Sequence, residues 1–181
     1  HLARVHGRGR DALPRGLHAQ VREQARPRTR LRGPAARGSV VGGGPGGSTA
    51  ARFCAKAGLK ALIIEKEKFP RYKPCGGCLS TKTVHLLGLN LTSVIENTIY
   101  GSKFTYRSKD PFFIETKDPI AFLVMRDRFD QLLINNALEE GAEILEGEKV
   151  TGVEEKGDGV EVELAKGKRF HSRYLIGADG P

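Results

Sequence analysis

The fold is decided by the stretch Val40-Val41-Gly42-Gly43-Gly44-Pro45-Gly46-Gly47, in which a short apolar strand enters a glycine-rich turn. Gly42 permits the tight turn, Gly44 lets the backbone approach a pyrophosphate, and Gly47 allows a following helix to pack against the strand. The helix N-terminus then faces the phosphates with unpaired amide groups and the positive end of its dipole. We expect Gly42, Gly44, Pro45 and Gly47 to form a phosphate-binding turn.

The residues that follow this turn complete a βαβ unit. The pattern predicts a helix over Ser48 to Lys56 and a strand over Ala61 to Ile64. Glu65 ends that strand, where its carboxylate can accept hydrogen bonds from the ribose of an adenosine and disfavours a 2′-phosphate. A glycine pattern alone could be an ordinary turn, but strand, turn, helix, strand and acid together predict dinucleotide binding.

The rest of the chain alternates strands and helices and ends in a β-meander. Ser80 can cap a short helix that stops at Gly88, and a longer helix is expected over Asp127 to Glu139. Turn sequences separate the predicted strands, which are Phe104 to Arg107, Phe112 to Thr116, Ile120 to Val124, Glu148 to Glu155, Gly159 to Leu164 and Arg169 to Ile176. The sequence predicts an α/β, Rossmann-like domain over residues 39 to 181.

The net charge of +9 is unevenly distributed. Residues 1 to 38 hold ten arginines and two acids, and they lack helical or strand periodicity. We expect this segment to be disordered, and either non-native, a targeting or linker segment, or a nucleic-acid-binding arm. A basic, non-enzymatic nucleic-acid-binding chain is the rival hypothesis. Because the remaining residues are nearly neutral, we expect no nucleic-acid partner.

Cysteine usage and hydropathy favour a cytoplasmic protein. Cys54, Cys75 and Cys78 are too few and too close together for a secreted disulfide framework. No apolar run reaches the roughly 18 residues that cross a bilayer, so only peripheral membrane contact is expected. Cys75 and Cys78 could form a redox dithiol or half of a zinc site, but zinc needs four ligands and we expect no metal.

Three segments resemble the flavoproteins related to aromatic hydroxylases. They are Arg126-Asp127-Arg128-Phe129-Asp130 at a helix start, the β-meander, and the terminal Gly177-Ala178-Asp179-Gly180. Within that group, the loop Lys73-Pro74-Cys75-Gly76-Gly77-Cys78-Leu79-Ser80 resembles the geranylgeranyl reductase family. The resemblance covers roughly residues 39 to 181 and implies that the cofactor is FAD.

The resemblance also implies roles for individual residues. Glu65 would bind the adenosine ribose, Arg126 would approach the flavin phosphate or ribityl chain, and the backbone at Val150 would meet the adenine. Asp179 and Gly180 would lie beside the pyrophosphate. The Cys75-Gly76-Gly77 loop would lie against the isoalloxazine ring, where glycines permit the close approach of a flat ring. Cys75 would then be the catalytic candidate at the hydride-transfer site.

The reaction implied by this resemblance is the saturation of isoprenoid double bonds by a hydride from reduced flavin and a proton. The alternative is a monooxygenase or halogenase of the same fold, from which only the Cys75 loop distinguishes this chain. The electron donor stays open. Members of the family continue past the Asp-Gly motif into a second glycine-rich loop and a substrate-binding sheet. We therefore expect an N-terminal fragment, incomplete at its C-terminus and without reductase activity alone.

Overall fold

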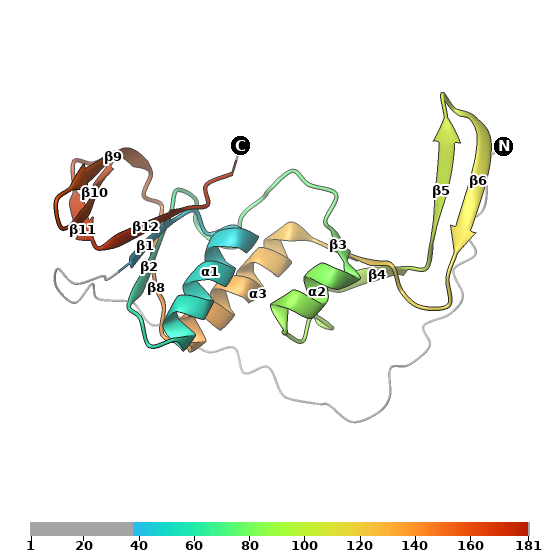
Figure 1. Cartoon of the computed structure of the whole chain (residues 1–181), viewed down its shortest axis with the longest axis horizontal. Coiled ribbons are helices and arrows are strands. Elements are labelled where there is room, and N and C mark those ends of the chain that lie inside the picture. Colours follow the sequence, from blue (N-terminus) through green and yellow to red (C-terminus); the bar gives the residue numbers. More distant parts are fainter. Residues whose placement is uncertain (1–37, 181) are drawn as a thin grey trace.

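The computed structural model describes residues 38–180 and is built around a parallel sheet (Figure 1). The strand order in that sheet is β12-β1-β2-β8. Its strands are β1 (Gly38–Val41), β2 (Ala61–Glu65), β8 (Glu143–Glu146) and β12 (Tyr174–Gly177). The Arg-rich segment predicted over residues 1 to 38 lies outside the described residues except for Gly38.

The two faces of this sheet are covered by different layers, as Figure 1 shows. Helices α1 (Pro45–Lys56) and α3 (Arg126–Glu139) pack on one face, where Ala61 and Ile63 of β2 join their core. The meander of β9 (Val150–Lys156), β10 (Gly159–Leu164) and β11 (Arg169–Ser172) packs on the other, against Leu62 and Ile64. Because side chains alternate along a strand, β2 serves both cores. The predicted α/β, Rossmann-like fold is confirmed.

The first strand is only four residues long, yet it is paired on both sides. It runs parallel to β12 and to β2 over its whole length. Ser39, 1 % exposed, would be an unfavourable residue in this central position, but its hydroxyl oxygen lies 2.9 Å from that of Ser172. That hydrogen bond satisfies both buried hydroxyls, which removes the main cost of burying them.

The single strand predicted over Arg169 to Ile176 is wrong, because the chain changes sheets at Arg173. Residues before it form β11, which pairs antiparallel with β10, and residues after it form β12, which pairs parallel with β1. Leu175 of β12 packs against the core beneath the parallel sheet. This exchange of sheets sends the chain after Gly177 directly to the glycine turn.

A second group of elements lies beside the start of α3. Strands β3 (Cys78–Ser80), β7 (Ala121–Val124) and β4 (Ile95–Ile99) form an antiparallel sheet beside α2 (Thr81–Leu87). As predicted, Ser80 caps α2, accepting a hydrogen bond from the Thr83 N–H at 3.2 Å, and Gly88 ends it with φ 58°. The core here joins Leu87, Leu91, Val94, Val124, Phe129 and Leu133.

The hairpin formed by β5 (Gly101–Tyr106) and β6 (Lys109–Glu115) projects from this end of the molecule (Figure 1). These strands pair with each other and, among the described residues, with no further strand. Phe112 and Phe113 are 57 % and 65 % exposed. The hairpin is therefore stabilised by its own cross-strand contacts, including the stacked rings of Phe104 and Phe112 at 5.0 Å.

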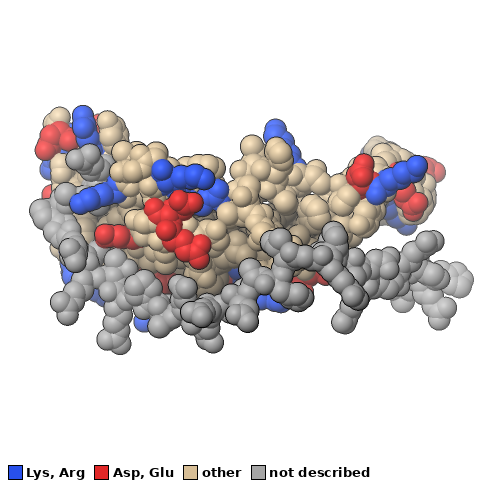
Figure 2. Space-filling model, turned by 90° about the horizontal axis from the view of Figure 1, so that it is seen from below, with Lys and Arg blue, Asp and Glu red and all other residues tan. Residues whose placement is uncertain are grey.

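Charged side chains are mixed on the face shown in Figure 2. Lys and Arg lie next to Asp and Glu there instead of gathering into one basic stripe. Among the described helices, none combines the length and the apolar character needed to cross a membrane.

We predict that Gly47→Ala destabilises the fold and that Gly46→Ala does not. A β-carbon on Gly47 would overlap the Gly42 carbonyl oxygen, whereas one on Gly46 would meet no atom of the described residues within 4 Å. Overpacking against backbone costs about 1–3 kcal/mol. Urea unfolding of both variants measures the difference in unfolding free energy. Equal stabilities would show that α1 can move away from β1 without cost.

Candidate functional site

The glycine turn is held between β2 and β12. The Gly42 N–H donates to the Ile64 carbonyl at 2.8 Å, and the Ala178 N–H donates to the Val41 carbonyl at 2.7 Å. Gly42 has φ 97°, and a β-carbon on it would overlap the Ala178 carbonyl oxygen. Glycine is thus required at this position by both backbone conformation and packing.

The start of α1 has the features of an anion site. Pro45 occupies the first turn, and within residues 38–180 no side chain caps the helix. The first N–H groups of a helix lack partners in the helix itself, so those of the first turn are available to an anion. A β-carbon on Gly46 would meet nothing among the described residues, and one on Gly44 would meet only Arg71, at 3.6 Å. These residues fit a pyrophosphate.

Glu65 lies beside this turn and helps to hold it. Its carboxylate accepts hydrogen bonds from the Gly43 N–H at 2.7 Å and from the Glu67 N–H at 3.1 Å. Sequence reasoning missed this internal role. An ionised carboxylate can accept about four hydrogen bonds, so acceptor capacity remains for a ribose hydroxyl. The ribose contact itself stays a prediction.

The other predicted adenosine and phosphate residues lie at the same edge of the sheet. The Glu148 N–H donates to the Glu65 carbonyl at 3.1 Å, which brings the segment leading to Val150 next to β2. Asp179 and Gly180 follow β12, and Asp179 lies against Gly42. The carboxyl edge of a parallel sheet is where open α/β folds bind their ligands.

The Cys75-Gly76-Gly77 loop is shaped by β7. Gly77 has φ 66°, and a β-carbon on it would overlap the Val124 carbonyl oxygen. The Val124 N–H in turn donates to the Gly77 carbonyl at 2.9 Å. The structure therefore requires glycine at position 77 for packing, a reason different from the approach of a flat ring. Gly76 is open, and a β-carbon there would contact none of the described atoms within 4 Å.

Cys75 and Arg126 come together at the start of α3. The thiol is exposed, and its pKa lies below the ordinary value because the Gly77 N–H and the Arg126 guanidinium both donate hydrogen bonds to the sulfur. Asp130, which is fully buried, accepts two hydrogen bonds from Arg126 at 2.8 and 2.9 Å. This pair raises the pKa of Arg126. The cation predicted to meet the flavin phosphate is thus held by Asp130 and Cys75.

Two members of this charged group, Asp130 and Arg71, were missed from the sequence. The i,i+4 spacing of Arg126 and Asp130 on a helix is a signal that could have identified Asp130. Arg71 reaches Asp130 at 3.3 Å from the loop after β2, a contact that local spacing does not reveal.

The remaining cysteines lie apart from this group. Cys78 pairs with Leu123 across β3 and β7, and Cys54 is half-buried on α1. All three thiols in the described part of the chain are free. The residues that the structure describes contain no cluster of three or more potential metal ligands.

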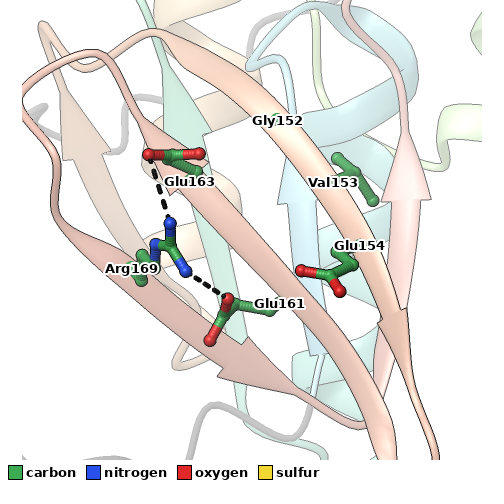
Figure 3. A pocket seen from close by; sticks show the side chains of 6 residues that line it. All are labelled: Gly152, Val153, Glu154, Glu161, Glu163 and Arg169. Atoms are coloured by element: carbon green, nitrogen blue, oxygen red, sulfur yellow. Dashed lines mark hydrogen bonds and ion pairs between the residues drawn. The ribbon is translucent and has the colours of Figure 1, made fainter.

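A hollow of about 190 Å³ lies on the meander, far along the chain from the glycine turn (Figure 3). Its lining includes Glu154, Glu161, Glu163 and Arg169. Arg169 already binds Glu161 at 3.0 Å and Glu163 at 3.6 Å, as the dashed lines in Figure 3 show. The predicted cofactor-binding residues instead lie together at the carboxyl edge of the parallel sheet, so we take that edge as the candidate site.

Comparison with known proteins identifies the family of this chain. The model of the family described as FAD binding domain matches residues 36–181. Digeranylgeranylglycerophospholipid reductase from Thermoplasma acidophilum is 32 % identical over 151 residues, covering 78 % of this chain and 38 % of the reductase.

Two solved structures share the fold at similar identity. A geranylgeranyl bacteriochlorophyll reductase-like protein from Thermoplasma acidophilum is 30 % identical, with a TM-score of 0.71 over 79 % of this chain and 38 % of that one. The flavin-dependent brominase Bmp2 is also 30 % identical, with a TM-score of 0.67 over 80 % and 38 %. The chain spans just over a third of the length of the curated relatives it matches.

We predict that Arg126→Met slows the alkylation of Cys75 by iodoacetamide at neutral pH. The thiolate is the reactive form, and the Gly77 N–H and then the Arg126 guanidinium keep the pKa of Cys75 low. Without the guanidinium the pKa rises toward its ordinary value, so the rate profile moves to higher pH. Peptide mass mapping separates Cys75 from Cys54 and Cys78. Arg128→Met, which removes an exposed arginine paired with Glu96, is the control, and an identical profile in both variants would contradict the prediction.

Proposed function

Because this chain belongs to the FAD binding domain family, we propose that it forms the FAD-binding part of an oxidoreductase that saturates isoprenoid double bonds. FAD is the cofactor of the family, in agreement with the sequence-based choice. The substrate class is the step that goes beyond the family.

The observation that carries this proposal is the Cys75 loop. Its thiol lies exposed near the start of α3 with its pKa lowered by Gly77 and Arg126. Arg126 is connected through Asp130 to Arg71, which lies beside Gly44 of the glycine turn. The resemblance of this loop to geranylgeranyl reductases adds the reaction type. A relative named digeranylgeranylglycerophospholipid reductase, at 32 % identity, supports the same substrate class.

The residues at the sheet edge would bind the adenosine and pyrophosphate parts of the cofactor. The first turn of α1, with Gly44 and Gly46 open above it, would hold the pyrophosphate, and Glu65 would hold the adenosine ribose. The backbone at Val150 would meet the adenine, and Asp179 and Gly180 would flank the phosphates. These contacts would position the cofactor, whose reduced form would supply a hydride, and a proton would complete the saturation of the double bond.

Cys75 and Arg126 are assigned to the other end of the cofactor. Arg126 is fixed by two hydrogen bonds to Asp130, so its remaining donors have a defined direction. Cys75 would lie against the isoalloxazine ring, held there by the Gly77 N–H and by Arg126. Both residues would therefore orient the ring toward its substrate, an effect that depends on near-contact distances.

The alternative is a monooxygenase or halogenase. The match to the brominase Bmp2 supports this alternative, because its TM-score of 0.67 is close to the value of 0.71 for the reductase-like structure. The glycine turn and Arg126 would serve either reaction, whereas the Cys75 loop favours the reductase. An isoprenoid substrate would also be consistent with peripheral contact to a membrane.

We predict that Glu65→Ala weakens FAD binding by about 1–3 kcal/mol, because ribose hydroxyls lose their acceptor. Flavin fluorescence titration of the purified chain measures the change in Kd. Glu67→Ala, which removes an exposed acid two residues away, is the matched control. Unfolding is followed in parallel, since Glu65 also holds the Gly43 N–H. Unchanged FAD affinity in a folded Glu65→Ala variant would contradict the ribose assignment.

We predict that Cys75→Ser lowers reduction while leaving FAD bound, and that Cys78→Ser has little effect. The test grafts residues 38–180 in place of the matching part of the Thermoplasma acidophilum reductase, with dithionite as reductant and a geranylgeranyl lipid as substrate. Mass spectrometry should find two added hydrogens for each reduced bond.

Three results of this graft experiment would oppose the proposal. A graft that binds FAD without reducing the lipid would count against the reductase. A halogenated or oxygenated product in air would favour the alternative reaction. Equal loss from both cysteine variants would support a redox dithiol.

A further inference from the structure

Arg71 is a buried cation at the candidate site that neither the glycine motif nor the resemblance includes. Its side chain is 9 % exposed, and its guanidinium carbon lies 5.1 Å from the centroid of the buried Phe69 ring. Stacking on an aromatic ring fixes the plane of a guanidinium and still leaves its edge free to donate hydrogen bonds. Arg71 is therefore held in one orientation.

The guanidinium lies between two carboxylates from different elements. Arg71 Nη2 is 3.3 Å from Asp130 Oδ2 on α3, and Arg71 Nε is 3.7 Å from Glu65 Oε2 at the end of β2. Asp130 also binds Arg126, so two arginines and two carboxylates form a charge-compensated group. Removing Arg71 would leave this group with excess negative charge at a buried position.

One hydrogen-bond donor of Arg71 has no partner among the described residues. Arg71 Nε is buried and has no hydrogen-bond partner among residues 38–180, because the Glu65 oxygen is too distant for a hydrogen bond. Buried side-chain donors in folded proteins are almost always paired, so the unpaired Nε of Arg71 calls for a further partner, such as a water, an ion or a ligand.

The direction of Arg71 indicates which ligand this is. A β-carbon on Gly44 would lie 3.6 Å from Arg71 Nη2, the nitrogen that also contacts Asp130, so this edge of the guanidinium faces the N-cap residue of α1. The unpaired N–H groups of the helix first turn lie at the same place. A buried cation and a helix N-terminus that converge on one open glycine form a site for phosphate oxygens.

We propose that Arg71 binds the pyrophosphate of the dinucleotide while it holds Glu65 and Asp130 in place. This inference rests on the dinucleotide site of the proposed function and adds to it a cation from outside the glycine motif. The first turn of α1 contributes backbone donors, and Arg71 contributes the side-chain charge.

The test compares ligands that share parts of the cofactor. FAD, ADP and adenosine are titrated calorimetrically into the wild-type chain, Arg71→Gln and Arg71→Lys. We expect Arg71→Gln to raise the Kd of FAD and of ADP by the same factor, on the order of 10- to 100-fold, since both carry the pyrophosphate. Adenosine binding should weaken by a smaller factor, because Arg71 contacts Glu65 but adenosine lacks the pyrophosphate. Arg71→Lys should recover part of the loss because it keeps the charge. Arg128→Gln, at an exposed arginine of α3, should leave all three affinities unchanged.

Several outcomes would overturn the assignment of Arg71. Unchanged ADP affinity in Arg71→Gln is one of them. Another is an equal loss of ADP and adenosine binding together with a lowered unfolding midpoint in both variants, which would give Arg71 a purely structural role. A wild-type chain that binds neither FAD nor ADP would reject the dinucleotide site as well. Normal ADP results beside a graft that reduces no isoprenoid would reject only the proposed reaction.

Discussion

The absence of a β-carbon at Gly42 and Gly47 is the constraint on which the rest of the structure depends. These residues let the first helix, the first strand and the end of β12 meet at backbone distance, with the Gly42 carbonyl against Gly47 and the Ala178 carbonyl against Gly42. Because β12 lies beside β1, the chain ends its last strand next to the turn that began the fold. Two segments far apart in sequence thus share one edge of the sheet.

Charge compensation is the second requirement at this edge. Asp130 is fully buried, and a lone buried carboxylate would be strongly unfavourable. Arg126 from the same helix and Arg71 from the loop after β2 both approach it, so the ion pairs connect α3 to the neighbourhood of Glu65. These ion pairs therefore link Arg126, at the start of α3, to Glu65, at the end of β2, in addition to the contacts made by the sheet.

Local signals allowed much of the fold and part of the site to be predicted. The glycine turn, both main helices and the Ser80 cap depend on residues near one another in sequence, and each was located within a few positions. The exchange of sheets at Arg173 was missed because pairing with β1 is a long-range contact that alternation within the strand does not encode. The same holds for Arg71, whose partners lie on other elements. For Gly77 the residue was identified but its packing against Val124 was not.

The β5–β6 hairpin bears on the colloidal behaviour of the protein. Each of its strands has one edge unpaired among the described residues, and its faces expose Phe104, Phe112 and Phe113. Open strand edges with exposed aromatic side chains are templates for pairing with another chain. Pro111 removes one backbone donor from β6, and the strands also carry charged side chains of both signs, Lys103, Lys109, Asp110 and Glu115. Salt screens exposed charges, so ionic strength changes how this arm behaves in concentrated solution.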